Sequence, residues 1–370
     1  MKRRLRFLFA AWVLGPFLLV GVAWEAASQE LTYGGPPLTL RFSTHSPLTH
    51  PLFNIWNPFF EMVKKESNGK LLFQVYAAGS LHGGRDGFKA CANDITDMTM
   101  GYPSWQAGSF QLMHVMEMPF AFPTPYVASI VGEELYPKYF KKEYEKLAVY
   151  LGDFHTTTPT HIISKKPIRK LDDLKGMKIR TSGGVTSDIL KNLGGVPVFL
   201  PTPEIYNALQ RGMIDGVLMP RQDLVSFKAQ EVGKYLTEIG AYMVPIPTCL
   251  NRKTFDGLPN DLKRMFYKQL RRLSQLAPTI NTPSDIEGVE NMKKAGVEII
   301  TMSPSEYEKA KKMVEPLCEE FIKKNEAQGL PAKQLMEELR SLTKKYSTWS
   351  PQQLMKKVME EPIRGIIDTM

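Results

Sequence analysis

The chain has 370 residues, of which 43% are hydrophobic, and it carries a formal net charge of +9. This length allows two domains with sizeable cores, and the sequence contains no internal repeat and no low-complexity segment. The cysteines Cys91, Cys249 and Cys318 are odd in number and widely spaced, which excludes a disulfide framework and a cysteine-based zinc pattern. At most one pair could form a disulfide, and the spacing does not say which.

The N-terminus has the three parts of a secretory signal peptide. A basic segment, Met1–Arg6, precedes an apolar stretch over residues 7–23, and small residues at 26–28 form a cleavage site. We therefore expect residues 1–28 to be a signal peptide and the rest of the chain to be a soluble protein of the periplasm. A permanent membrane anchor is the alternative, but the apolar stretch is short and contains a Gly-Pro break.

The charge of the exported chain bears on its partners. The signal segment holds four basic residues and one acid, so its removal lowers the net charge by three, to +6. A modest positive charge suits anionic solutes. The basic residues are dispersed among acids in predicted helices, which does not favour nucleic acid as a partner.

The first third of the chain alternates between strands and helices. Residues 38–43 and 70–76 alternate like strands on either side of a helix at 52–66, and a third strand is predicted at 96–100. Loops at the strand ends carry His45 and, further on, Tyr102 and Trp105. We expect the two large rings to form an aromatic wall for a ligand, with packing beneath the loop as the alternative.

Residues 171–220 show the clearest pattern. Apolar runs at 177–181, 196–200 and 217–219 alternate with helices, which predicts βαβ units and a parallel sheet. Arg180 sits at the end of the first run, and Ser182, Gly183 and Gly184 open the following helix. A guanidinium fork beside free N–H groups at a helix N-terminus is suited to a carboxylate, although an ordinary surface salt bridge is the alternative.

The same stretch resembles a known family. DLKGMKIR, LGGVPVFLP and EIYNALQRGMIDG look like the signature region of the substrate-binding proteins of TRAP transporters (tripartite ATP-independent periplasmic transporters). AGSLHGGRDGFKACANDITDMTMG, MPFAFPT and FDGLP resemble further family segments in the same order. The resemblance extends over roughly residues 38–330.

The resemblance implies a fold, a role and a partner. The fold would be α/β, a two-domain periplasmic binding protein of the type II-like clamshell kind, with a long hinge helix that starts near Pro259. Residues 259–277 have the helical pattern that such a helix needs, and Pro278 predicts a bend. Arg180 would clamp the carboxylate of a small ligand, and membrane permease subunits would receive it. The expected division is domain I at 31–157 and 246–285, domain II at 158–245 and 286–330, and C-terminal helices at 331–370 that pack across both domains.

Departures from the family pattern indicate the ligand. Met219 replaces a polar ligand-binding residue, Thr160 replaces a second arginine, and Tyr102 replaces an acid; the acidic pair with Trp that holds a cation in some members is not evident. These departures remove charge or hydrogen-bonding capacity, so we expect a monocarboxylate with an apolar body. A dicarboxylate whose second end meets His45, His155 or Arg221 stays open.

Enzyme motifs are lacking. The sequence has no G-x-S-x-G elbow, no H-E-x-x-H and no P-loop. We therefore expect binding without catalysis, cofactor or metal. A periplasmic sensing module for a membrane receptor and a secreted α/β hydrolase remain as alternatives. The predicted ligand-binding residues are Arg180, Ser182, Gly183, Tyr102, Trp105, Met219, His45 and His155.

Overall fold

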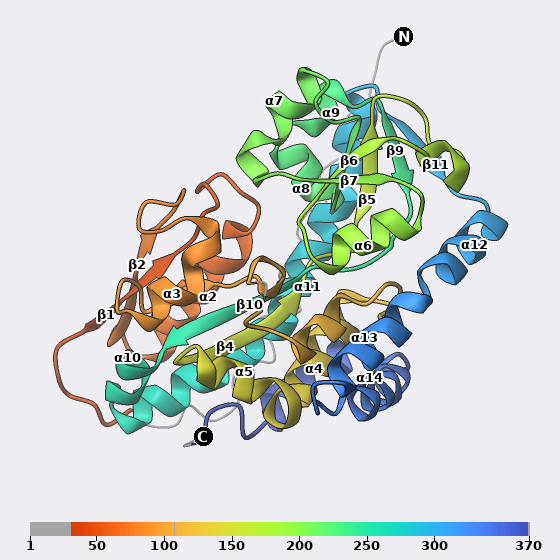
Figure 1. Cartoon of the computed structure of the whole chain (residues 1–370). Helices are drawn as coiled ribbons and strands as arrows, with labels where there is room; N and C mark the ends of the chain where they lie inside the picture. The colour runs from red at the N-terminus through yellow and green to blue at the C-terminus, as the bar shows by residue number, and fades with distance from the viewer. Residues whose placement is uncertain (1–30, 107, 369–370) are drawn as a thin grey trace, which may run out of the picture.

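The computed structural model describes residues 31–106 and 108–368, which form two α/β domains joined by a long helix (Figure 1). The predicted signal peptide lies outside these residues. Among the helices that the structure describes, none combines the length and the apolar character needed to span a bilayer. The expected fold class, a two-domain clamshell with a long helix, is confirmed.

The first domain is built on a five-stranded mixed sheet. Its strands follow the order β2-β1-β3-β10-β4, with β1 parallel to β2 and β3, and β10 antiparallel to β3 and β4. The chain therefore returns to this sheet after passing through the second domain. The strands are β1 (Leu38–Ser43), β2 (Leu71–Tyr76), β3 (Met98–Met100), β4 (Val149–Thr156) and β10 (Pro245–Asn251).

The second domain is built on a six-stranded mixed sheet in the order β11-β9-β5-β8-β6-β7. The predicted parallel unit is present, since β6 pairs in parallel with both β7 and β8. Two short strands that the sequence patterns did not reveal, β9 and β11, extend the sheet. The strands are β5 (His161–Ser164), β6 (Lys178–Thr181), β7 (Val196–Phe199), β8 (Gly216–Met219), β9 (Tyr235–Glu238) and β11 (Glu298–Thr301).

Amphipathic helices cover the sheets. In the first domain the α-helices are α2 (Phe53–Glu66), α3 (Gly87–Ala92), α4 (Pro125–Leu135), α5 (Lys141–Lys146) and α10 (Arg252–Gly257), with a π-helical turn at Tyr136–Phe140. In the second domain they are α6 (Val185–Asn192), α7 (Ile205–Gln210), α8 (Arg221–Ser226) and α9 (Ala229–Val232). Short 3-10 turns lie at Gly84–Asp86, Pro103–Trp105, Leu112–Glu117, Leu171–Leu174 and Thr202–Glu204.

Helix α11 (Asn260–Lys294) connects the two domains. It packs against α2, α4 and β4 of the first domain and, further along, against α8 of the second. The helix continues through Pro278 and Pro283. The bend that the sequence predicts at Pro278 stays a prediction. A proline inside a helix costs about 3 kcal/mol, and burial of one face of α11 from Leu262 to Met292 offsets that cost.

The C-terminal helices are α12 (Pro304–Val314), α13 (Pro316–Glu326), α14 (Ala332–Tyr346) and α15 (Pro351–Glu360). The apolar residues of α14 and α15 belong to the core of the first domain, where α14 packs on α4 and α15 packs on α11. None of their residues belongs to the described apolar clusters of the second domain. The predicted domain bounds, and the predicted packing of residues 331–370 across both domains, stay a prediction.

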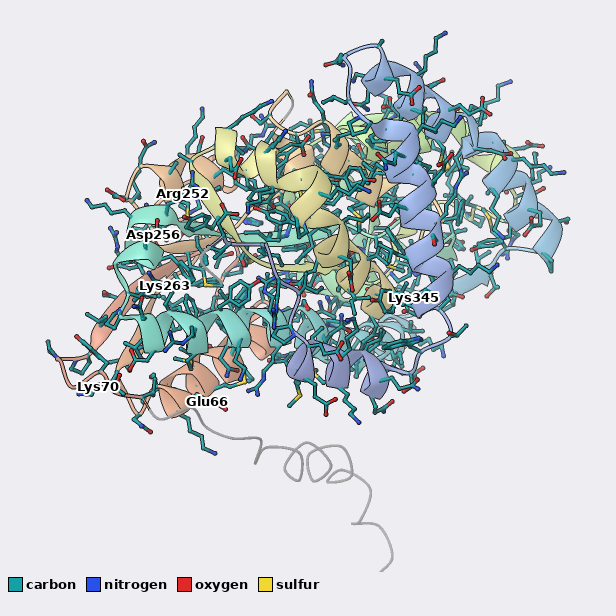
Figure 2. All side chains as sticks on the ribbon, turned by 90° about the horizontal axis from the view of Figure 1, so that it is seen from below. Glu66, Lys70, Arg252, Asp256, Lys263 and Lys345 are labelled. Carbon is teal, nitrogen blue, oxygen red and sulfur yellow. The ribbon has the colours of Figure 1, made fainter. Side chains whose placement is uncertain are left out.

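Acidic and basic side chains alternate over the outer face of the first domain (Figure 2). Around the ends of α2, α10 and α11, the acids Glu66 and Asp256 lie among the bases Lys70, Arg252 and Lys263. The Lys263 ammonium donates a hydrogen bond to the Asp256 carbonyl at 2.8 Å. This mixing of charge is the pattern expected of solvated helix faces.

Candidate ligand-binding site between the two domains

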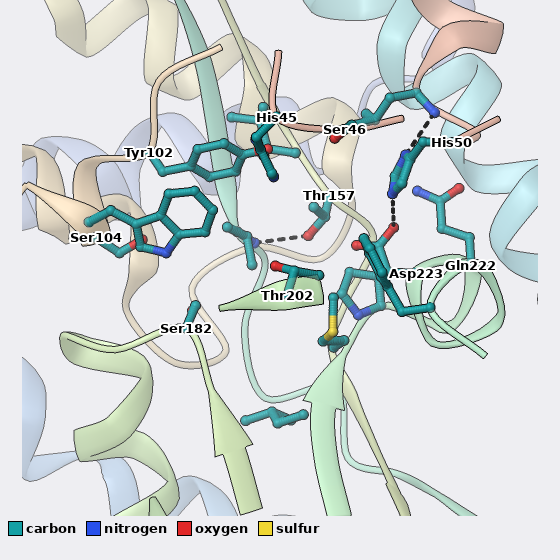
Figure 3. A pocket seen from close by; sticks show the side chains of 18 of the residues that line it. His45, Ser46, His50, Tyr102, Ser104, Thr157, Ser182, Thr202, Gln222 and Asp223 are labelled. Carbon is teal, nitrogen blue, oxygen red and sulfur yellow. Dashed lines mark hydrogen bonds and ion pairs between the residues drawn. The ribbon is translucent and has the colours of Figure 1, made fainter. Parts of the chain in front are cut away.

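A pocket lies where the loops after the strands of the two sheets meet (Figure 3). The space open to the centres of water molecules is about 70 Å³, and in this measure a single water needs roughly 10–15 Å³. The pocket therefore suits a small organic molecule. It is lined by His45, Ser46, His50, Leu52, Tyr102, Ser104, Trp105, Thr157, Arg180, Ser182, Thr202, Leu218, Met219, Pro220, Gln222, Asp223, Phe227, Tyr242, Val244 and Ile246.

Arg180 lies near the carboxyl end of β6 and is 3% exposed. Its Nε donates to the Leu200 carbonyl oxygen at 3.0 Å, and its Nη2 donates to Thr202 Oγ1 at 3.4 Å. Both partners are neutral, and no acidic side chain of residues 31–106 or 108–368 lies within ion-pair distance of the guanidinium. The two hydrogen bonds hold the fork in place at the pocket wall.

Burial lowers the pKa of Arg180 to about 10, while Tyr242 and Asp223 oppose that shift. The guanidinium is therefore charged at neutral pH although it is removed from water. A buried charge without a hydrogen-bonded ion pair is costly in free energy. This part of the pocket is suited to receive an anion.

A glycine turn connects β6 to α6 beside Arg180. Gly183 has φ +94° and Gly184 has φ +57°, in the left-handed region that favours glycine. Ser182 lines the pocket, and its Oγ lies 3.1 Å from Thr186 Oγ1. Gly183 does not line the pocket. Phe199 lies 3.1 Å from the point where a side chain at Gly183 would begin. The turn therefore presents Ser182 to the pocket.

Aromatic rings from the first domain form another wall. Tyr102 and Trp105 stack with ring centroids 4.3 Å apart and an interplanar angle of 28°. The His45 ring meets both edge-on, at 5.4 Å from Tyr102 and 5.3 Å from Trp105. Trp105 Nε1 is buried without a hydrogen-bond partner among the described residues. An apolar ligand body would contact this aromatic cluster.

His50, Gln222 and Asp223 form a polar corner on the side of the pocket away from Tyr102 and Ser104 (Figure 3). His50 Nε2 lies 3.7 Å from Asp223 Oδ1. Burial, reinforced by Asp285, raises the pKa of Asp223 to about 7 against the opposing effect of Arg180. Burial lowers the pKa of His50 to about 4, so the ring is neutral at pH 7.

The two domains touch beside the pocket. The Arg85 guanidinium of the first domain lies 4.3 Å from the ring centroid of Phe199 in β7. The His50 ring lies 5.5 Å from that of Phe227 in the second domain. Both contacts join residues that the sequence separates by more than a hundred positions. They hold the domains together around the pocket.

The family model described as "Bacterial extracellular solute-binding protein, family 7" matches residues 42–325. The chain belongs to that family. Its resemblance to the solute-binding proteins of TRAP transporters is thereby confirmed. A curated relative named "Solute-binding protein", from Albidiferax ferrireducens, is 27% identical over 259 residues, which cover 68% of this chain and 75% of the relative.

Solved structures share the fold of this solute-binding protein. A TRAP solute-binding protein from Rhodoferax ferrireducens, solved with copurified benzoate, superposes with a TM-score of 0.80 at 24% identity, covering 84% of this chain and 98% of the other. A marine metagenome protein specific for aromatic acids, solved with 3-hydroxybenzoate, gives a TM-score of 0.79 at 24% identity, covering 85% and 100%.

Most of the ligand-binding residues predicted for this solute-binding protein meet at the pocket. The structure brings together Arg180, Ser182, Tyr102, Trp105, Met219 and His45 on its walls, whereas Gly183 and His155 do not line it.

His155 lies elsewhere, in the interior of the first domain. Its side chain is fully buried, and its Nδ1 lies 2.6 Å from Asp153 Oδ2. Asp153 in turn accepts a hydrogen bond from Thr248 Oγ1, so this group links β4 to β10. Arg221 is also occupied, by ion pairs of 2.6–2.7 Å with Glu238 and Asp285. Neither His155 nor Arg221 is therefore placed to meet the second end of a dicarboxylate.

Sequence reasoning missed the polar corner and Thr202. Asp223 and Gln222 follow the carboxyl end of β8, and ligands bind at this end of the strands in open α/β sheets. Their position after the predicted strand could therefore have identified them as candidate ligand-binding residues. His50 comes from a loop in the other domain. Only the packing of the domains shows that it meets Asp223.

Proposed function

We propose that this protein binds a small aromatic monocarboxylate through Arg180 and delivers it to the membrane subunits of a TRAP transporter in the periplasm. The observation that carries the proposal is a buried guanidinium at a pocket wall without an ion-pair partner among the described residues. A ligand carboxylate would accept hydrogen bonds from the fork and neutralise its charge.

The shape and chemistry of the pocket support an aromatic body. The stacked rings of Tyr102 and Trp105 offer a flat apolar surface, and Met219 adds a polarisable apolar contact on the other domain. Aromatic rings pack favourably against one another in offset or edge-to-face arrangements. The structural neighbours solved with benzoate and 3-hydroxybenzoate share this fold and give the proposal its ligand class.

Domain closure links binding to delivery. Arg180 belongs to the second domain and the aromatic wall to the first, so one ligand would contact both. Ligand binding would favour the closed arrangement by its differential contacts with the two domains. The closed protein then presents a surface that membrane subunits recognise.

Thermal unfolding with a matched set of ligands tests the proposal. Benzoate and 3-hydroxybenzoate at 100 times their Kd should stabilise the protein by about 2.7 kcal/mol, whereas benzamide, which lacks the carboxylate, should have no effect. Succinate reports on a dicarboxylate site. If only succinate or sugar acids shift the melting curve, the proposed ligand class is wrong; if benzamide acts like benzoate, the carboxylate clamp is wrong.

A further inference from the structure

We propose that the polar corner formed by His50, Gln222 and Asp223 binds a hydrogen-bond-donating substituent of the ligand, a hydroxyl or an amino group, at the end away from Arg180. The ligand class would then be hydroxy- or amino-substituted aromatic acids. This inference rests on the proposed function, because it takes the carboxylate to be held by Arg180.

Asp223 is a carboxylate that lines the pocket without a hydrogen-bond donor of its own. It lies in the first turn of α8, and its side chain is 15% exposed. No group of the described residues donates a hydrogen bond to it. His50 Nε2 is 3.7 Å from its Oδ1, beyond hydrogen-bond distance. The ionised form of Asp223, which a pKa of about 7 leaves populated at neutral pH, can therefore accept a hydrogen bond from a ligand, and a donor on the ligand would favour that form.

The tautomer of His50 follows from its other nitrogen. The Leu52 backbone N–H donates to His50 Nδ1 at 3.2 Å, so in the neutral ring the proton is on Nε2. A dashed line in Figure 3 joins the His50 ring to Asp223, and Nε2 lies 3.7 Å from Asp223 Oδ1. A hydroxyl or amino group of the ligand beside these two residues would accept a hydrogen bond from His50 Nε2 and donate one to the Asp223 carboxylate.

Gln222 contributes a further polar atom. The residue is 4% exposed, and its Nε2 donates to Asn281 Oδ1 at 3.4 Å. Its Oε1 is buried and has no partner among the described residues. A buried acceptor left without a donor typically costs about 1–3 kcal/mol, so the Gln222 amide has an unmet hydrogen-bonding capacity beside the pocket.

The corner is held rigidly. Asp285 on α11 accepts hydrogen bonds from the backbone N–H groups of Arg221 at 2.9 Å and Gln222 at 3.4 Å. It also pairs with the Arg221 guanidinium at 2.7 Å. The first turn of α8 is therefore fixed to the long helix, and Asp223 is in position before a ligand arrives. Such preorganisation favours specificity.

Isothermal titration with matched ligands tests the inference. The probes are benzoate and its 2-, 3- and 4-hydroxy and amino derivatives. A hydrogen bond to a charged acceptor corresponds to roughly 10-fold to 100-fold in affinity. We expect at least one hydroxy or amino isomer to bind the unmodified protein at least tenfold more tightly than benzoate. Comparison of the hydroxybenzoates with the aminobenzoates shows which hydrogen-bond donor the corner prefers.

The decisive variant is Asp223→Ala, with Asp223→Asn as a second variant should the first unfold. We expect Asp223→Ala to bring the affinity ratio of substituted acid to benzoate within threefold, while benzoate still binds. Asp188→Asn, at an exposed position of α6, is the matched control and should keep the ratio. His50→Gln should reduce the ratio partially.

Three outcomes would overturn the inference. The unmodified protein could show no preference for any substituted acid, Asp223→Ala could leave the ratio unchanged, or it could weaken all ligands equally. An equal loss of affinity for all ligands would show that Asp223 acts only through its charge on Arg180 and does not contact the ligand substituent. In each of these cases benzoate still binds through its carboxylate, so the proposed function stands. Failure of the proposed function would look different, because then no aromatic carboxylate would bind at all.

Discussion

Replacement of Arg180 by alanine should abolish tight binding of aromatic acids. The guanidinium is 3% exposed, and two hydrogen bonds to Leu200 and Thr202 fix its position, so the ligand meets a prepositioned charge. Removing one partner of a buried, hydrogen-bonded charge pair costs about 2–5 kcal/mol. This corresponds to a loss of roughly 30-fold to several thousand-fold in Kd.

Two further variants sharpen this experiment. Arg180→Lys keeps the charge but loses the planar fork, so we expect an intermediate loss of about tenfold or more. Arg169→Ala removes a guanidinium that is 59% exposed in a surface pair with Glu298. Such pairs contribute at most about 1 kcal/mol, and this control should bind as the unmodified protein does.

Titration calorimetry with 3-hydroxybenzoate measures the affinities, and urea unfolding without ligand measures stability. Because the ligand-free protein buries the Arg180 charge without an ion pair, Arg180→Met should leave the free energy of unfolding unchanged or raise it, by up to about 1–4 kcal/mol. A loss of affinity under threefold in folded Arg180→Ala would refute the carboxylate clamp. A large loss of stability in Arg180→Met would show a structural role instead.

Three more outcomes follow from the packing. Asp285→Ala breaks a buried pair and should lower the free energy of unfolding in urea by about 3–5 kcal/mol, whereas Glu290→Ala, in an exposed pair on the same helix, should lower it by less than about 0.5 kcal/mol. The pKa of His50 is about 4 when folded and 6.5 when unfolded, so its contribution to stability is present above pH 6.5 and is lost as pH falls through 4. Denaturation between these pH values should reveal a loss of at most about 3 kcal/mol from this group, and His50→Gln should flatten it; an unchanged slope would contradict the assignment. Burial and the neighbouring Cys249 thiol raise the pKa of Cys91. Because Cys91 and Cys249 are buried, both should react with Ellman's reagent only after unfolding. Cys318 is only partly buried, so rapid reaction of more than one thiol per folded chain would be the contrary result.

The sequence predicted the second sheet best where periodicity and turns agree. Short apolar runs separated by helices placed β6, β7 and β8 within one or two residues, and the glycine turn identified Arg180 as a residue at the end of a strand. These signals are local, since each depends on residues a few positions apart. Strands β9 and β11 were missed although they are as long as β6, β7 and β8. They join the sheet by pairing with residues far away in the sequence, β9 with β5 and β11 with β9, and no local pattern shows such a pairing.

The sequence predicted only those residues of the candidate site that local patterns identify. Arg180, Tyr102 and Trp105 follow strands or belong to loops with a clear signal, and they line the pocket. His50 and Asp223 are 173 positions apart and meet only when the domains pack, so no local pattern connects them. His155 lies near the end of a predicted strand, as the pocket residues do. Its side chain is nevertheless buried in the core, where it pairs with Asp153.

Helix α11 shows how tertiary contacts override local preference. Pro278 and Pro283 lie inside the helix, yet it continues because its buried face packs on both domains. The sequence contains the apolar positions of that face but not the surfaces that cover them.

A crystal structure of the protein with 3-hydroxybenzoate tests the central claim most directly. We expect the ligand carboxylate to lie within hydrogen-bond distance of the Arg180 guanidinium, with the ring against Tyr102 and Trp105. A ligand whose carboxylate points to solvent, or binds elsewhere while Arg180 contacts no anion, would contradict it.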